Sequence, residues 1–215
     1  MLEPLLPILE RKQIILASSS PRRKEILNML GLKYQIVTSD FEENLNKDDF
    51  PTPVQYAIET SRRKAVDVAE ILSKASKSAD LIIAADTIVT VDNVIYGKPK
   101  DQADAIGILK KLNNRSHTVE TGVTLLYPSN GKFLSRCFSE TTLVHITGMT
   151  QSMMEGYVKT GEPMGKAGAY GIQGKGGSLI EKISGDYYNV MGFPLHKFCK
   201  ELITLYTELG FVDKA

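Results

Sequence analysis

Cysteine and histidine are scarce in this chain, which limits the kinds of site that it can carry. The 215 residues include two cysteines, Cys137 and Cys199, which are far apart and belong to no CxxC unit. This spacing suggests neither a zinc site nor a disulfide framework. The three histidines, His117, His145 and His196, share no metal-ligand spacing. We therefore expect reduced thiols in an intracellular compartment and place the protein in the cytoplasm.

The chain also lacks an excess of charge of either sign. Lys and Arg number 26, Asp and Glu number 25, and the formal net charge is +1. A general nucleic-acid-binding protein would show a basic excess, so we expect no nucleic-acid partner. A small anionic ligand is compatible with this balance, because a local cluster of Arg and Lys is enough to bind it.

Long apolar runs are absent as well, and none approaches the length that a transmembrane helix requires. The start of the sequence, MLEPLLPILERK, is apolar, but it contains Glu3 and two prolines and lacks a basic segment and a small-residue cleavage site. We expect an N-terminal arm over residues 1–12, not a signal peptide, and no membrane partner.

Strand and helix patterns alternate along the sequence, with turn signals at Asp92-Asn93 and at SNG (129–131) that predict two hairpins. This order predicts an α/β fold with a mixed central β-sheet flanked by helices, in a single domain over residues 1–215. Strands are expected at 13–18, 34–39, 80–91, 94–97, 117–128, 132–147 and 178–183, and helices at 21–31, 53–72, 103–109, 150–161 and 195–209.

The segment LASSSPRR, residues 16–23, joins the first expected strand to the first expected helix. Serine at the cap and Pro21 at the first helical position predict a helix start. Such a start presents free backbone N–H groups and the positive end of the helix dipole. With the hydroxyl of Ser18 and the guanidinium groups of Arg22 and Arg23, it suits a phosphate or polyphosphate. A capped surface helix with solvated arginines is the alternative.

Asp86 directly follows the apolar run LIIAA, and the strand pattern continues beyond it through Ile88 and Val91. A turn would explain an aspartate at a strand end, but no turn follows here, and an ionised side chain in a buried strand is costly without a partner. A carboxylate in this place can bind Mg²⁺ or orient a water molecule as a general base. In the helix before this strand, one residue of Arg62-Arg63-Lys64 is expected to face the sheet while its neighbours face water.

Further charged residues stand near loops, where each alone is more often solvated surface. Glu43 opens an acidic loop, and Lys98 precedes a proline after a strand. The segment GKAGAYGIQGKGG (165–177) allows close backbone approach to a ligand, although it matches neither a Walker A loop nor GxGxxG after a strand. No GxSxG nucleophile motif is present. The residues together favour metal-assisted phosphate chemistry built from carboxylates and basic side chains.

Six motifs follow one another along the chain: LASSSPRR (16–23), FEE (41–43), ADTIV (85–89), GKP (97–99), GEPMGKAGAYGIQGKGG (161–177) and NVMGFPL (189–195). In this order they resemble the Maf nucleoside triphosphate pyrophosphatase family, and the resemblance spans residues 14–209. It implies a two-lobed single domain like that of the inosine triphosphate pyrophosphatases. It also implies hydrolysis of a nucleoside triphosphate to the monophosphate and pyrophosphate, as house-cleaning of nucleotide pools, with a divalent metal, Mg²⁺ or alternatively Mn²⁺.

The resemblance assigns roles to individual residues. Asp86 would be the general base, and Asp86 and Glu43 would hold the metal. Arg22, Thr87 and Gln173 match the subgroup that acts on dTTP and UTP, with CTP and modified pyrimidine nucleotides as further candidates. The substrate-binding residues would be Ser18, Arg22, Arg23, Lys64, Thr87, Lys98 and Gln173.

The sequence departs from the family at Gly165, where other members usually have aspartate. This keeps open a nucleotide-binding regulatory protein without turnover, and a purine triphosphate pyrophosphatase of the inosine type is a second alternative. The expected partner is the nucleoside triphosphate, and a homodimer is an assembly that the sequence leaves open.

Overall fold

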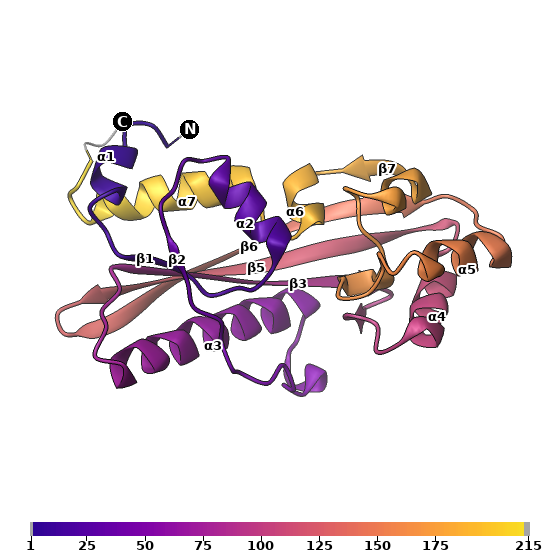
Figure 1. Ribbon diagram of the computed structural model, residues 1–215, viewed down its shortest axis with the longest axis horizontal. Helices are drawn as coiled ribbons and strands as arrows, with labels where there is room; N and C mark the ends of the chain where they lie inside the picture. The colour runs from indigo at the N-terminus through magenta and orange to yellow at the C-terminus, as the bar shows by residue number, and fades with distance from the viewer. Residues whose placement is uncertain (1, 213–215) are drawn as a thin grey trace.

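A mixed seven-stranded sheet runs through the length of the molecule (Figure 1). The computed structural model describes residues 2–212. The sheet order is β2-β1-β3-β5-β6-β7, with β4 paired to β3. The strands are β1 (Ile14–Leu16), β2 (Gln35–Ile36), β3 (Leu81–Val91), β4 (Val94–Tyr96), β5 (Arg115–Ser129), β6 (Lys132–Ile146) and β7 (Ile180–Ser184). The α-helices are α1 (Leu6–Leu9), α2 (Pro21–Asn28), α3 (Pro53–Lys74), α4 (Gln102–Leu112), α5 (Gln151–Lys159), α6 (Tyr187–Met191) and α7 (Leu195–Glu208).

The mixed sheet expected from the sequence is confirmed. β1 pairs in parallel with β2 and β3, whereas the other pairings are antiparallel. Both predicted hairpins form, because Asp92-Asn93 and Asn130-Gly131 adopt the positive φ angles that tight hairpin turns require. The helix starts also agree with the sequence, since Ser20 caps α2 and Thr52 caps α3 through their side chains.

Several elements differ in extent from the sequence-based prediction, two strands most clearly. The strand expected at 34–39 shortens to the two residues of β2, and the strand expected at 178–183 forms as β7 two residues later, after a 3-10 turn at Lys175–Leu179. The short helix α6 was not predicted. Residues 2–12 contain α1, and the side chains of Leu5 and Leu9 are buried in the core.

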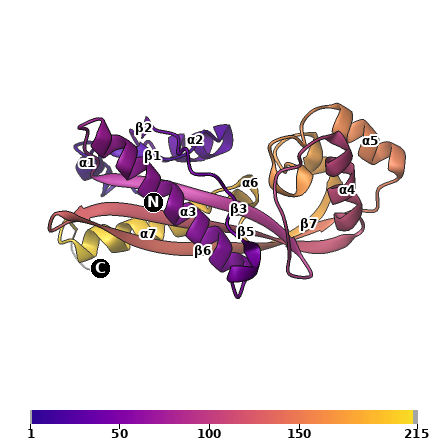
Figure 2. The same ribbon diagram turned by 90° about the horizontal axis from the view of Figure 1, so that it is seen from below.

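The two faces of β3 serve two different cores. Leu81, Ile83 and Ala85 pack with α1, α2 and α7, whereas Ile82 and Ala84 pack with α3. α3 lies on one side of the sheet, α2 and α7 on the other (Figure 1). Figure 2 shows α4 and α5 at the end of the long β5–β6 hairpin that lies opposite its turn, where they cover a separate core. No helix within residues 2–212 is long and apolar enough to cross a membrane.

The edge of β3 that faces β1 and β4 has a gap in its pairing. β1 pairs with Leu81–Ile83, and β4 pairs with Val89–Val91. Within the described part of the chain, residues 84–88 therefore have a strand partner only on the β5 side. Successive side chains of a strand point to opposite faces, so Asp86 lies on the α3 face and Thr87 on the face of α2 and α6. Both residues stand at the gap.

Gly122 on β5 is the register partner of Asp86, and it lets α3 approach the sheet closely. A Cβ atom at this position would lie 2.5 Å from the backbone of Ala57 and Ile58 in α3. We predict that Gly122→Ala lowers the free energy of unfolding by about 1–3 kcal/mol, because the helix must shift to admit the methyl group. Urea unfolding measures this change.

Gly107→Ala is the matched control for this prediction. Gly107 is exposed within α4 and has no atom within 4 Å of its missing Cβ. Alanine there is expected to raise the stability by about 0.5–1 kcal/mol, because it favours the helical backbone. Equal stability of the two variants would contradict the proposed close approach of α3.

Candidate active site

The ammonium group of Lys64 joins two carboxylates at the gap in the sheet edge. Lys64 Nζ lies 2.7 Å from Asp86 Oδ1 and 2.9 Å from Glu43 Oε1. Lys98 Nζ approaches the same Glu43 oxygen at 3.7 Å. As expected, one residue of the basic triplet on α3 faces the sheet, whereas Arg62 and Arg63 bond outward to Glu59.

Burial and nearby positive charges shift the pKa values of the two carboxyl groups, Asp86 and Glu43, in opposite directions. Burial raises the pKa of Asp86 above its ordinary value, and the charges of Lys64 and Arg23 oppose this effect only in part. Burial also acts to raise the pKa of Glu43, but Lys64, Lys98 and Arg23 outweigh it, so the pKa of Glu43 is lowered. Glu43 thus stays ionised readily, whereas Asp86 accepts a proton more readily than an exposed aspartate does.

Arg23 connects the start of α2 with the opposite face of β3. Its Nη1 donates to Ser18 Oγ at 3.3 Å, and its Nη2 donates to Thr87 Oγ1 at 3.0 Å. Its Nε donates to the carbonyl oxygen of Gly192 at 2.9 Å. The side chains of Ser18, Arg23 and Thr87 therefore form one hydrogen-bonded group, and the charge of Arg23 also acts on Asp86.

The carbonyl groups at the end of α6 hold both arginines, which the sequence analysis did not foresee. Arg22 Nε donates to the Met191 carbonyl oxygen at 3.0 Å, beside the bond from Arg23 to Gly192. Gly192 ends α6 with a φ of 116°, a conformation that favours glycine. A glycine followed by Phe193-Pro194 could have indicated this helix end. The acceptors themselves could not be predicted, because every residue type has a backbone carbonyl group.

Glu162 organises the Gly-rich loop and was also missed. Its carboxylate accepts bonds from the backbone N–H groups of Lys175 and Gly176 at 2.8 and 2.9 Å, and from the Tyr157 hydroxyl at 3.0 Å. A Cβ atom on Gly174 would lie 2.4 Å from this carboxylate. The loop therefore folds around Glu162, and its glycines make room for the contact.

Gln173 projects from this loop toward α2. Its Nε2 lies 3.1 and 3.2 Å from the two carboxylate oxygens of Glu25, and both side chains are exposed. No hydrogen bond or ion pair among the described residues joins Gln173 directly to the other residues that the sequence analysis selected. Its link to them runs through α2, which also carries Arg22 and Arg23.

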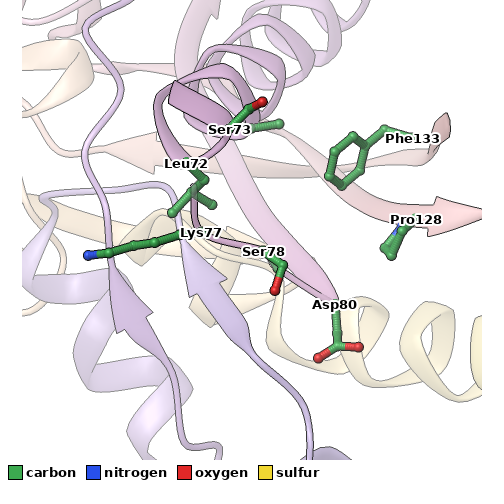
Figure 3. Close-up of a pocket in the computed structure, with 9 residues that line it drawn as sticks. Leu72, Ser73, Lys77, Ser78, Asp80, Pro128 and Phe133 are labelled. Carbon is green, nitrogen blue, oxygen red and sulfur yellow. The ribbon is translucent and has the colours of Figure 1, made fainter. Parts of the chain in front are cut away.

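A cavity of about 320 Å³ lies away from this cluster, at the beginning of β3 (Figure 3). Leu72, Pro128 and Phe133 are among its lining residues, together with Asp80. Asp80 precedes Asp86 by six residues, which corresponds to about 20 Å along an extended strand. Its carboxylate accepts a 2.7 Å bond from the backbone N–H of Gln13, so it fixes the start of β1. The charged cluster is thus separate from the cavity.

The family model described as Maf-like protein matches residues 13–205, which include every residue of the cluster. The chain belongs to the Maf family. Curated Maf relatives align with it over most of its length. A human protein named probable bifunctional dTTP/UTP pyrophosphatase/methyltransferase protein is 45% identical over 208 residues, or 94% of this chain. The alignment covers 34% of that relative, so the chain spans about a third of its length.

Shorter Maf relatives match almost end to end. A dTTP/UTP pyrophosphatase of Dictyoglomus turgidum is 45% identical over 86% of this chain and 92% of its own length. A dTTP/UTP pyrophosphatase of Thermococcus kodakarensis is 41% identical over 92% of this chain and 97% of its own length.

The pyrophosphatase names of these Maf relatives raise the question of a divalent metal. Among residues 2–212, no group of three or more histidine, cysteine or carboxylate side chains gathers to hold one. Asp86 and Glu43 nevertheless share one partner, Lys64, so two hard oxygen donors lie close together. Mg²⁺ at phosphate-transfer sites is bound by one or two carboxylates and substrate phosphates. The donor set fits that mode of binding.

The pair of Lys64 and Asp86 yields a prediction about stability. We expect Lys64→Met to destabilise the fold by about 3–5 kcal/mol, because it leaves the buried Asp86 carboxylate without its cation. The double variant Lys64→Met/Asp86→Asn is expected to recover much of this loss, because no buried charge is then left unpaired. Chemical unfolding of both variants measures the difference. A double variant less stable than Lys64→Met would contradict the pairing.

Proposed function

We propose that this protein hydrolyses dTTP and UTP to the nucleoside monophosphate and pyrophosphate, with Mg²⁺ as the divalent metal and Mn²⁺ as an alternative. The observation that carries the proposal is the cluster at the sheet-edge gap. It combines two carboxylates, Lys64 and Lys98 with the arginines at the start of α2. A polyphosphate needs several cations, and attack on its phosphorus needs a base nearby. The names of the Maf relatives agree with this chemistry.

Each residue of the cluster has a role in the proposed reaction. Ser18, Arg22 and Arg23 bind the phosphates together with the backbone N–H groups at the start of α2. Lys64 and Lys98 neutralise charge that develops on the leaving pyrophosphate. Asp86 and Glu43 would hold the metal, which supplies further positive charge next to the phosphate oxygens.

Asp86 acts as the general base of this mechanism. Its carboxylate orients a water molecule and takes its proton while the water oxygen forms a bond to the α-phosphorus and the bond to the pyrophosphate oxygen breaks. The raised pKa of Asp86 suits proton acceptance, and Lys64 keeps the group ionised before the reaction. No covalent intermediate is required.

Base selectivity is proposed to reside in Arg22, Thr87 and Gln173. Thr87 lies beside Arg23, and Gln173 faces α2. This combination favours the pyrimidine nucleotides dTTP and UTP over a purine of the inosine type. The Gly-rich loop remains ordered around Glu162 although Gly165 lacks a side chain, which favours turnover over a purely regulatory role.

The cellular setting is also part of the proposal. Cys137 and Cys199 are both free thiols, which agrees with a reducing compartment such as the cytoplasm. A homodimer and the absence of nucleic-acid and membrane partners remain predictions from the sequence.

The products of the reaction provide a direct test. We predict that UTP and dTTP yield pyrophosphate and the monophosphate, and that removal of divalent metal with EDTA abolishes turnover until Mg²⁺ is restored. Chromatography of the products identifies the bond that is broken. Release of orthophosphate and a nucleoside diphosphate would show cleavage of the β–γ bond and overturn the proposal.

Asp86→Asn tests the general base. Asparagine has almost the same shape but accepts no proton, so kcat is expected to fall by roughly 10²-fold or more. Nucleotide binding should persist, because Ser18, Arg22 and Arg23 are unchanged. Steady-state kinetics and calorimetric titration of the same variant measure the two effects, with thermal melting as the control for folding. Activity within a few-fold of the parent would remove Asp86 from the catalytic role.

A further inference from the structure

The contact between Glu25 and Gln173 fixes the orientation of the glutamine amide. Nε2 of Gln173 lies within 3.2 Å of both carboxylate oxygens of Glu25. An ionised carboxylate accepts hydrogen bonds and donates none, so it selects the nitrogen end of the amide. The other end of the amide, Oε1 of Gln173, is then presented away from Glu25 as a hydrogen-bond acceptor.

Glu25, which holds this amide, stands one helical turn from Arg22, one of the two arginines that are proposed to bind phosphate. Arg22 and Glu25 are three residues apart on α2 and so share one face of the helix, separated by about 5 Å along its axis. Burial and then the charge of Arg22 lower the pKa of Lys166, which is in the same loop as Gln173. The Gly-rich loop thus contacts this face of α2 through Gln173.

Hydrogen bonds also hold the backbone on either side of Gln173. Glu162 binds the N–H groups of Lys175 and Gly176, and the Tyr157 hydroxyl accepts from the N–H of Gly171 at 3.1 Å. The loop is thus anchored on both sides of Gln173. An amide on an anchored backbone, with one end held by a carboxylate, presents a directional acceptor to a ligand.

We propose that Glu25 is a positioning residue for base recognition, which holds the Gln173 amide so that Oε1 accepts the N3–H of uracil or thymine. This inference rests on the proposed function. Uracil and thymine carry a proton on N3, whereas N3 of cytosine is itself an acceptor and would face Oε1 unfavourably. A site that depends on a directional bond rejects a ligand that leaves it unpaired. The arrangement therefore selects UTP and dTTP over CTP.

Glu25→Gln and Glu25→Ala test this role, because both release the amide so that it can present either end. The ratio of kcat/KM for UTP to that for CTP is expected to fall by about 10-fold or more, the factor of one directional hydrogen bond. Turnover of UTP itself should stay within a few-fold of the parent. Glu70→Gln is the matched control, because Glu70 is an exposed glutamate on α3, and its ratio should not change.

An exchange of the two side chains makes the test sharper. Gln173→Glu alone brings two carboxylates together and is expected to lower the ratio. In the double variant Glu25→Gln/Gln173→Glu, the new amide donates to the new carboxylate, whose second oxygen still accepts from N3–H, so the preference for UTP should recover. Thermal melting confirms folding of each variant.

Two outcomes would overturn the inference. One is a parental UTP-to-CTP ratio in both Glu25 variants, and the other is an exchange variant that recovers no preference. Calorimetric titration with UTP and with CTP measures the same preference as a ratio of affinities, and this measurement does not depend on turnover. A parent protein that releases no pyrophosphate would refute the proposed function, while the affinity ratios would still decide the role of Glu25.

Discussion

The burial of one carboxylate in the middle of a strand is the constraint on which the site depends. Asp86 has a relative exposure of 6%, and a charge in such a place is costly without a partner. α3 meets this requirement, because it carries Lys64 to within 2.7 Å of the carboxylate. Gly122, opposite Asp86 on β5, lets the helix come close enough for this contact. Helix packing, strand register and electrostatics are thus coupled at a single position.

The gap in the edge pairing of β3 leaves two consecutive residues beside one opening in the sheet. In a fully paired strand, Asp86 and Thr87 would be separated by the sheet, because they point to opposite faces. Here β1 ends before them and β4 begins after them, so the edge between is open. Arg23 spans this opening, since it bonds to Thr87 on one face and its charge acts on Asp86 on the other. In the proposed function, the chemistry and the recognition of the nucleotide therefore lie on different faces of one strand.

Much of the fold followed from local signals in the sequence. The buried run before Asp86, the two hairpin turns and the serine cap before Pro21 each predicted an element that the structure contains. The short helix α6 was not predicted, because it has only five residues and is held by distant contacts, such as those from Asn189 to Val119 and Thr142. The basic and acidic members of the candidate site were named from motifs and the family resemblance.

The supporting contacts of the site could not be predicted from the sequence. Arg22 and Arg23 bond to backbone carbonyl groups 169 residues away, and Glu162 bonds to backbone N–H groups. Such partners do not depend on the type of side chain at those positions. Glu25 is an exposed helix residue whose partner, Gln173, lies 148 residues away in the sequence. The charged groups leave a pattern in the sequence, whereas the groups that orient them do not.

The length of the β5–β6 hairpin has a mechanical consequence. Fifteen consecutive residue pairs join the two strands without interruption, from Arg115–Ile146 to Ser129–Lys132, over about 50 Å. This ladder passes through both the core beneath α7 and the core beneath α4 and α5. A hinge between the two ends would have to break ladder hydrogen bonds, so the ends can move relative to each other only as the hairpin twists or bends elastically. In the proposed reaction, entry and release of the nucleotide at the gap must then rely on local movement of side chains and loops, because the two ends of the sheet are held together by this ladder.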